Sequence, residues 1–161
     1  MSGFGRILED LNRNGVGYVL IGGIALIRHG VVRATRDIDA VFDHDPQNVE
    51  RLRHLIAEWA ATRPDGSPLP EGAIAQDRNI HLATPHGEID RPTDCTLPFA
   101  FGDLLARSDI RRVDGVQAPI CSLVDLVALK RFAARERDLV DLSDLEVAHG
   151  DLPDSRNTPG A

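Results

Sequence analysis

Two short segments decide the fold of this chain: Ile21-Gly22-Gly23-Ile24-Ala25 and Arg33-Ala34-Thr35-Arg36-Asp37-Ile38-Asp39. An apolar run of β-forming residues, Tyr18–Ile21, leads into the glycine pair, which predicts a strand, a tight turn and a short helix over residues 24–29. The second segment opens a strand over residues 37–42. Because strand side chains alternate between faces, Asp37 and Asp39 point the same way.

This spacing favours phosphate chemistry. Two carboxylates on one face of a strand repel each other unless a cation lies between them, and hard oxygen ligands suit Mg²⁺ or Mn²⁺. A Gly-Gly turn that opens a helix lets backbone N–H groups approach a phosphate. Each feature alone is usually structural, as a tight turn or a solvated strand end. Their order along Gly22–Asp39 predicts a site for phosphoryl or nucleotidyl transfer.

The surrounding pattern predicts an α+β fold. Asp114-Gly115 between two apolar runs is a strong hairpin signal, and strands and helices do not alternate regularly as in a doubly wound sheet. We therefore expect a mixed, twisted β-sheet with helices packed on one side. The predicted helices cover 4–11, 24–29, 46–59, 97–106, 122–135 and 138–148, and the predicted strands 18–21, 37–42, 79–83, 86–89, 110–113 and 116–120.

Length and composition limit the alternatives. The 161 residues suffice for one domain, which we place at residues 1–149, with a loop at 63–77 and a disordered polar tail at 150–161. A net charge of −7 argues against broad, charge-driven coating of nucleic acid. No apolar run reaches membrane-span length, and we expect no secretory signal. Cys95 and Cys121 are too few for a disulfide framework, so we expect a cytoplasmic protein.

The first motif resembles the minimal nucleotidyltransferases of the DNA-polymerase-β superfamily, whose signature is a Gly-Gly or Gly-Ser turn followed by Asp-x-Asp or Asp-x-Glu. The form Ile-Gly-Gly-x-Ala through Arg-x-Thr-x-Asp-Ile-Asp is similar to a bacterial branch that includes nucleotidyltransferase toxins of the abortive-infection, type IV toxin–antitoxin kind. That branch also has a lysine helix leading through a basic turn to an Asp and a final helix, as in Leu129–Leu142. The resemblance covers Tyr18 to Leu145.

The resemblance implies a catalytic set. Asp37 and Asp39 would bind two catalytic metal ions, and a carboxylate from a neighbouring strand would complete the site. Asp90, which follows the predicted strand 86–89, is the first candidate, and Glu88 on the same face is the alternative. The reaction implied is in-line attack of a hydroxyl on the α-phosphorus of a nucleoside triphosphate (NTP), with release of pyrophosphate.

The resemblance also implies nucleotide-binding residues: Gly22, Gly23, Arg33, Thr35 and Lys130, with Arg33 and Thr35 either touching phosphate or orienting the Asp pair. Lys130 is the only lysine in the sequence. It would approach the triphosphate, and the alternative is a solvated basic helix face that it shares with Arg137. Arg36 is expected at the surface. Asp138 and Asp141 are read as the cap and first turn of the last helix and are not placed in the site.

Three functional hypotheses follow from these observations. The first is a metal-dependent nucleotidyltransferase acting on tRNA as a toxin with a cognate antitoxin. The second keeps the chemistry but uses a small-molecule acceptor such as an aminoglycoside or lincosamide, which an acidic chain favours. The third is a catalytically silent nucleotide-binding regulator. Because the C-terminal region is short, we expect a homodimer or a partner protein to supply part of the acceptor surface.

Overall fold

A six-stranded mixed sheet forms the centre of the computed structural model, which describes residues 2–70, 72–74, 79–91 and 97–154. Its strand order is β3-β4-β2-β1-β6-β5. Two of the pairings, β1 with β6 and β2 with β4, are parallel, and the others are antiparallel. The strands are β1 (Tyr18–Leu20), β2 (Asp37–Phe42), β3 (Ile80–Thr84), β4 (Gly87–Arg91), β5 (Asp109–Val113) and β6 (Val116–Ile120).

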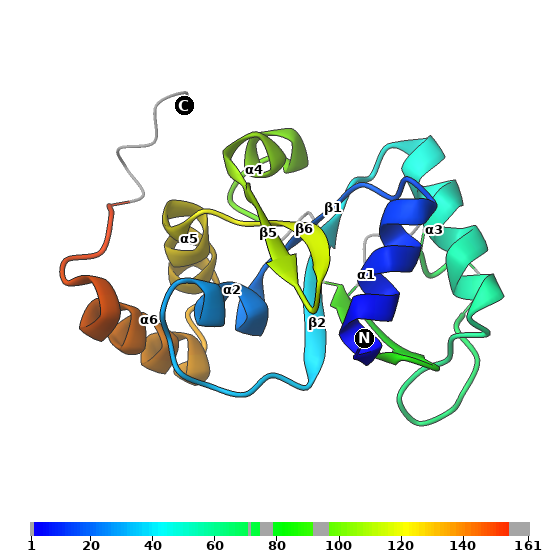
Figure 1. The fold of residues 1–161 in the computed structure, drawn as a ribbon, viewed down its shortest axis with the longest axis horizontal. Helices are drawn as coiled ribbons and strands as arrows, with labels where there is room; N and C mark the ends of the chain where they lie inside the picture. Colours follow the sequence, from blue (N-terminus) through cyan, green and yellow to red (C-terminus); the bar gives the residue numbers. More distant parts are fainter. Residues whose placement is uncertain (1, 71, 75–78, 92–96, 155–161) are drawn as a thin grey trace.

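Six helices in the described residues pack around this sheet, which confirms the predicted α+β class. Figure 1 shows α1 and α3 at one end of the molecule and α2, α5 and α6 at the other. The helices are α1 (Gly3–Arg13), α2 (Gly22–Arg28), α3 (Pro46–Glu58), α4 (Phe101–Arg107), α5 (Leu123–Ala133) and α6 (Glu136–His149). None of them is long and apolar enough to cross a membrane.

Local sequence explains where the elements begin. Asp45 caps α3 by accepting a 2.9 Å hydrogen bond from the Gln47 N–H, with Pro46 in the first helical turn. Ser122 caps α5 by accepting a 3.1 Å hydrogen bond from the Asp125 N–H. The Asp114-Gly115 turn joins β5 to β6 as an antiparallel hairpin.

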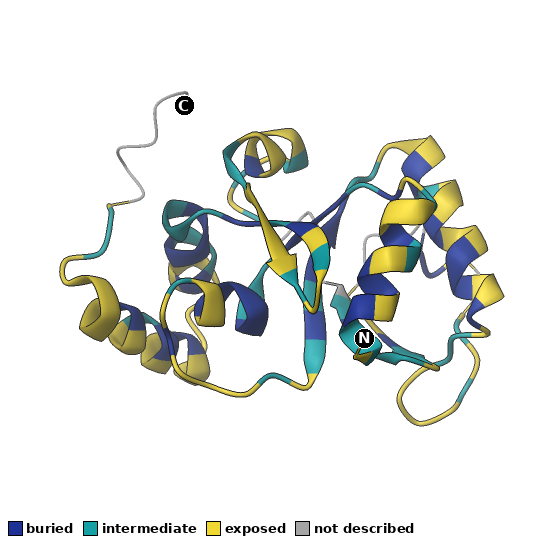
Figure 2. Ribbon diagram, viewed as in Figure 1, coloured by how far each residue is buried: buried dark blue, intermediate teal, exposed yellow. Residues whose placement is uncertain are grey.

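The core runs through the middle strands of the sheet. All of β1 is buried, and β2 alternates at its start, with Ile38 buried between the half-buried Asp37 and Asp39. In Figure 2 the central strands are mostly buried, whereas α6 is largely exposed. The sheet therefore anchors the acidic end of β2 in a rigid core while leaving its carboxylates accessible.

Three of the differences from the predicted boundaries concern residues of the site described below. Helix α2 begins at Gly22, so the glycine pair forms its first turn. Helix α4 begins only at Phe101, four positions after the predicted start at Leu97. Asp90, expected just past a strand end, lies inside β4, because it pairs with Asp39 of β2 and His81 of β3 and the β3 pairing continues to Arg91. Cys95, residues 155–161 of the predicted tail, and residues 71 and 75–77 of the predicted loop lie outside the described residues.

Candidate active site

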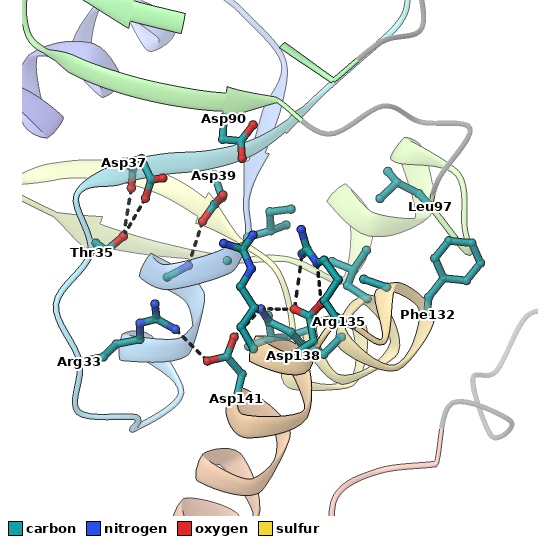
Figure 3. Close-up of a pocket in the computed structure, with 18 of the residues that line it drawn as sticks. Arg33, Thr35, Asp37, Asp39, Asp90, Leu97, Phe132, Arg135, Asp138 and Asp141 are labelled. Carbon is teal, nitrogen blue, oxygen red and sulfur yellow. Dashed lines mark hydrogen bonds and ion pairs between the residues drawn. The ribbon is translucent and has the colours of Figure 1, made fainter. Parts of the chain in front are cut away.

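The strands β2 and β4 bring three carboxylates to one cavity. In their parallel pairing Asp39 lies opposite Asp90, and Asp37 lies opposite Glu88. Asp37, Asp39 and Asp90 all line a cavity of about 620 Å³ between the sheet and the α5–α6 junction. Figure 3 shows these three side chains at the same side of the cavity. Glu88 does not line it, and its carboxylate instead contacts His81 Nε2 at 3.1 Å.

The glycine pair packs directly against this acidic edge. Gly22 has a φ of +56°, and a Cβ there would overlap the Asp39 carboxylate. A Cβ on Gly23 would lie 2.5 Å from Thr35 Oγ1. The Gly23 N–H donates a 3.1 Å hydrogen bond to Asp39 Oδ2. Both positions require glycine because no side chain fits between the turn and the strand.

Thr35 orients the other carboxylate of β2. Its Oγ1 lies 3.1 Å from the Asp37 carbonyl oxygen and 3.3 Å from Asp37 Oδ1, and its hydroxyl donates toward them. Arg33, two residues earlier, places its guanidinium 2.8 Å from Asp141 Oδ1 on α6. The segment before β2 therefore contacts both the acidic edge and the opposite wall of the cavity.

The surroundings of Asp39 disfavour the ionised form of its carboxyl group. Burial raises the pKa of Asp39 above its ordinary value, and the hydrogen bond from Gly23 opposes that rise. The neighbouring carboxylates of Asp37 and Asp90 raise the pKa further, and Lys130 lowers it. A cation at this edge of the sheet would relieve the repulsion.

A buried ionic network forms the opposite wall. Lys130 is 8% exposed, and its Nζ lies 2.8 Å from Asp138 Oδ1 and 2.6 Å from Asp141 Oδ2. Arg135 Nε contacts Asp138 Oδ2 at 2.7 Å. Burial raises the pKa of Asp138, but hydrogen bonds from Arg135 and Lys130 outweigh it and bring the pKa to about 2. Asp138 is therefore ionised, and the contacts of Asp138 and Asp141 with Nζ hold Lys130 in place.

The structure brings the predicted site residues together. All of them line the cavity: Gly22, Gly23, Arg33, Thr35, Asp37, Asp39, Asp90 and Lys130. Arg36 is exposed and does not line it, as predicted. The alternative that Lys130 belongs to a solvated basic face is wrong, because two aspartates bury its ammonium group.

Two residues that sequence analysis left outside the site are part of it. Asp138 does cap α6, accepting a 3.2 Å hydrogen bond from the Arg135 N–H, but it and Asp141 also line the cavity. Their spacing of three positions on a helix, downstream of a single lysine, is the signal that could have identified them. Phe132 and Leu97 also line the cavity, and no sequence motif distinguishes them from core residues.

The carboxylates of Asp37, Asp39 and Asp90 are chemically suited to bind a divalent cation. Three carboxylates on adjacent strands supply the hard oxygen ligands that Mg²⁺ and Mn²⁺ prefer. In the part of the chain that the structure describes, no three His, Cys, Asp or Glu side chains form a ready-made metal-binding group. Asp37 is instead directed toward Thr35, and Asp39 toward the Gly23 amide. Each of these hydrogen bonds engages one carboxylate oxygen, Asp37 Oδ1 or Asp39 Oδ2, so the second oxygen of each side chain could ligate a cation while the bond is kept.

Solved structures share this fold. The solution structure of the antibiotic-resistance factor ANT(2'')-Ia matches with a TM-score of 0.60 and 10% identity over 92% of this chain and 83% of that chain. A crystal structure of ANT(2'')-Ia in complex with adenylyl-2''-tobramycin matches with a TM-score of 0.58 and 12% identity, over 89% of this chain and 86% of that chain. An antigenic nucleotidyltransferase-like protein from Paracoccidioides brasiliensis matches with a TM-score of 0.54 and 15% identity, over 89% of this chain and 72% of that chain.

The family comparison covers nearly the whole chain. A family model described as "Nucleotidyltransferase of unknown function (DUF6036)" matches residues 6–150. The search of curated proteins finds no match. The matched range contains the whole cavity, from the glycine pair to Asp141. The chain belongs to the nucleotidyltransferase family DUF6036.

Proposed function

We propose that this protein is a divalent-cation-dependent nucleotidyltransferase that transfers a nucleoside monophosphate from an NTP to a hydroxyl acceptor. One observation carries the proposal. Asp37, Asp39 and Asp90 line one cavity from two paired parallel strands, against the Gly22-Gly23 turn. Family membership supports the same activity.

Asp37, Asp39 and Asp90 would hold Mg²⁺ or Mn²⁺. Two such ions would supply activation of the acceptor hydroxyl and stabilisation of the charge on the leaving group. Thr35 and the Gly23 amide position the two carboxylates of β2, and the strand pairing fixes Asp90 beside them. Glu88 is excluded from our ligand set because its side chain lies with His81, outside the cavity.

The wall opposite the carboxylates would receive the triphosphate. Lys130 is held between two aspartates, so its ammonium group is fixed in position and the two carboxylates offset its charge. The Arg33 side chain is 40% exposed and can approach a phosphate more freely. Gly22 and Gly23 keep this turn against the acidic edge, because a Cβ at either position would meet Asp39 or Thr35.

The chemical step is a substitution at the α-phosphorus. The acceptor oxygen forms a bond to this phosphorus while the bond to the bridging oxygen breaks, and pyrophosphate leaves with that oxygen. The acceptor proton is lost to the aqueous cavity or to a carboxylate at its acidic edge. Fixed positive charge close to the phosphates stabilises the negative charge that develops in the transition state.

Two acceptor classes, cationic aminoglycosides and tRNA, can be tested directly. ANT(2'')-Ia is described as an antibiotic-resistance factor and was solved with adenylyl-2''-tobramycin. A cationic acceptor of this kind suits a chain with a net charge of −7. The toxin hypothesis instead requires tRNA as the acceptor and an antitoxin as the partner.

The test is transfer of label from each α-³²P-labelled NTP, with Mg²⁺, to tobramycin or to total tRNA. We expect label on one acceptor class and a reduction on the order of 100-fold or more in Asp39→Asn and Asp90→Asn. Glu88→Gln is the matched control and should retain activity, because it removes a neighbouring carboxylate on the same strand but outside the cavity. Full activity in Asp90→Asn, with loss in Glu88→Gln, would overturn the ligand set. NTP binding without any transfer would indicate the silent regulator.

A further inference from the structure

The candidate active-site cavity has two chemically different ends. The acidic end is formed by β2 and β4, with Asp37, Asp39 and Asp90. The other end is apolar and is formed by α5, with Leu129 and Phe132, and by Leu97, four positions before the start of α4. In Figure 3 Leu97 and Phe132 lie on the opposite side of the cavity from Asp37.

Phe132 is exposed although it is a large aromatic residue. Its side chain lines the cavity and is 56% exposed, whereas Phe42 in the core is 1% exposed. An exposed aromatic ring beside other apolar groups costs free energy in water, and a ligand that covers it gains that free energy. The cavity therefore offers a hydrophobic contact that nothing in the described residues fully covers.

Phe132 lies close in sequence to the two cations of the buried ionic network. It lies two residues after Lys130 on α5 and three residues before Arg135, and all three line the cavity. A nucleotide carries its base and its triphosphate on one ribose, so the subsites for base and phosphates must lie close together on one wall. The acceptor hydroxyl must attack the α-phosphorus from the side opposite the leaving pyrophosphate, so the acceptor needs a subsite separate from those of the base and the triphosphate.

We propose that Phe132 is the platform on which the nucleobase of the NTP stacks, with Leu129 and Leu97 enclosing the base. This inference rests on the proposed nucleotidyltransferase function. An aromatic ring stacks on the π-face of every base and does not read its hydrogen-bonding edge. Phe132 accordingly contributes to the affinity for all four nucleotides to a similar extent.

The test measures the affinity of the α,β-methylene analogues of the four NTPs, in Mg²⁺, by isothermal titration calorimetry. We expect Phe132→Ala to weaken binding of each analogue by on the order of tenfold. Phe132→Tyr should bind as the wild type does, because it keeps the aromatic face. Phe132→Leu keeps apolar volume without the ring and should fall between them.

Inorganic tripolyphosphate separates stacking from a structural effect, because it has no base. Its affinity should be unchanged in Phe132→Ala. Leu139→Ala is the matched control, since Leu139 is 59% exposed but does not line the cavity. Leu139→Ala should change neither the affinity for the NTP analogues nor the affinity for tripolyphosphate.

Three outcomes would overturn the inference. If Phe132→Ala binds all four analogues as tightly as the wild type, the base does not stack on Phe132. If the substitution then raises only the KM for the acceptor, Phe132 contacts the acceptor instead. If the affinity for tripolyphosphate falls by the same factor, the role of Phe132 is structural. If the wild type binds no analogue at all, the proposed function itself fails and this inference fails with it.

Discussion

The backbone N–H of Gly23 donates a 3.1 Å hydrogen bond to Oδ2 of Asp39. The glycine turn and the acidic strand are therefore one structural unit and not two independent motifs. Gly22 completes the unit, because its missing side chain leaves room for the same carboxylate. The need for glycine at these positions arises from packing within the protein before any phosphate is considered.

Gly22→Ala should damage both stability and activity. Its Cβ would overlap the Asp39 carboxylate, and its φ of +56° strains any L side chain. We expect a loss of about 1–3 kcal/mol in the free energy of unfolding, measured by urea denaturation, together with loss of transfer. Gly15→Ala is the control, since Gly15 has a φ of +62° and no atom within 4 Å of the added Cβ. Equal losses in both variants would show that contact with Asp39 contributes nothing.

Asp39→Asn should stabilise the metal-free protein while abolishing transfer. Burial and the neighbouring Asp37 and Asp90 raise the pKa of Asp39, so its ionised form costs free energy at neutral pH. Asn can still accept the hydrogen bond from Gly23. In EDTA we expect Tm to rise by about 2–4 °C, the shift that about 1 kcal/mol produces in a chain of this size.

Excess Mg²⁺ supplies the second half of this test. It should raise the Tm of the wild type, because a ligand that binds only the folded state stabilises it. It should leave the Tm of Asp39→Asn nearly unchanged, while Glu88→Gln responds like the wild type. A lower Tm for Asp39→Asn in EDTA would contradict the electrostatic argument.

Lys130→Met should be strongly destabilising. Lys130 is the shared partner of Asp138 and Asp141, which are 0% and 5% exposed. Loss of the ammonium leaves two buried carboxylates with only the arginines at the rim, and we expect about 3 kcal/mol of lost stability. Arg131→Met removes the exposed cation that follows Lys130 in the sequence, and it should change the free energy of unfolding by less than about 0.5 kcal/mol. Chemical denaturation of both variants decides between a buried structural cation and a surface one.

The stability of the protein should fall in acid because of Asp138. Burial raises its pKa, but hydrogen bonds from Arg135 and Lys130 bring it to about 2, below the ordinary value of 3.8. The folded state therefore binds fewer protons than the unfolded state between these values. The contribution is fully present above the unfolded pKa and is lost as pH falls through about 2. It amounts to about 2 kcal/mol, since one pKa unit corresponds to about 1.4 kcal/mol.

Urea denaturation at about pH 6 and about pH 3 measures this dependence. Asp138→Asn should have a smaller difference in unfolding free energy between the two pH values than the wild type. Asp144→Asn, on the exposed face of the same helix, should keep the wild-type difference. An unchanged pH dependence in Asp138→Asn would assign the acid sensitivity to other carboxylates.

Local signals in the sequence were sufficient for most of the fold. The alternation around Ile38 predicted β2 with its observed bounds, and Asp114-Gly115 predicted the last hairpin. These signals succeed because strand periodicity and turn chemistry depend on neighbouring residues. The placement of Asp90 inside β4, opposite Asp39, was not predictable in this way, because it depends on pairing with β3 and with β2, a segment about 50 positions earlier in the chain.

The amino-acid order alone determined the chemistry available to this protein: a glycine turn, a run of aspartates on one strand face, and a single lysine near the C-terminus. The tertiary structure decided which of these groups meet. It seated Asp90 rather than Glu88 beside Asp39, buried Lys130 between Asp138 and Asp141, and left the ring of Phe132 at the far end of the same cavity. The reason is physical, since strand register and the burial of paired charges are set by contacts between segments distant in sequence, which local patterns do not encode.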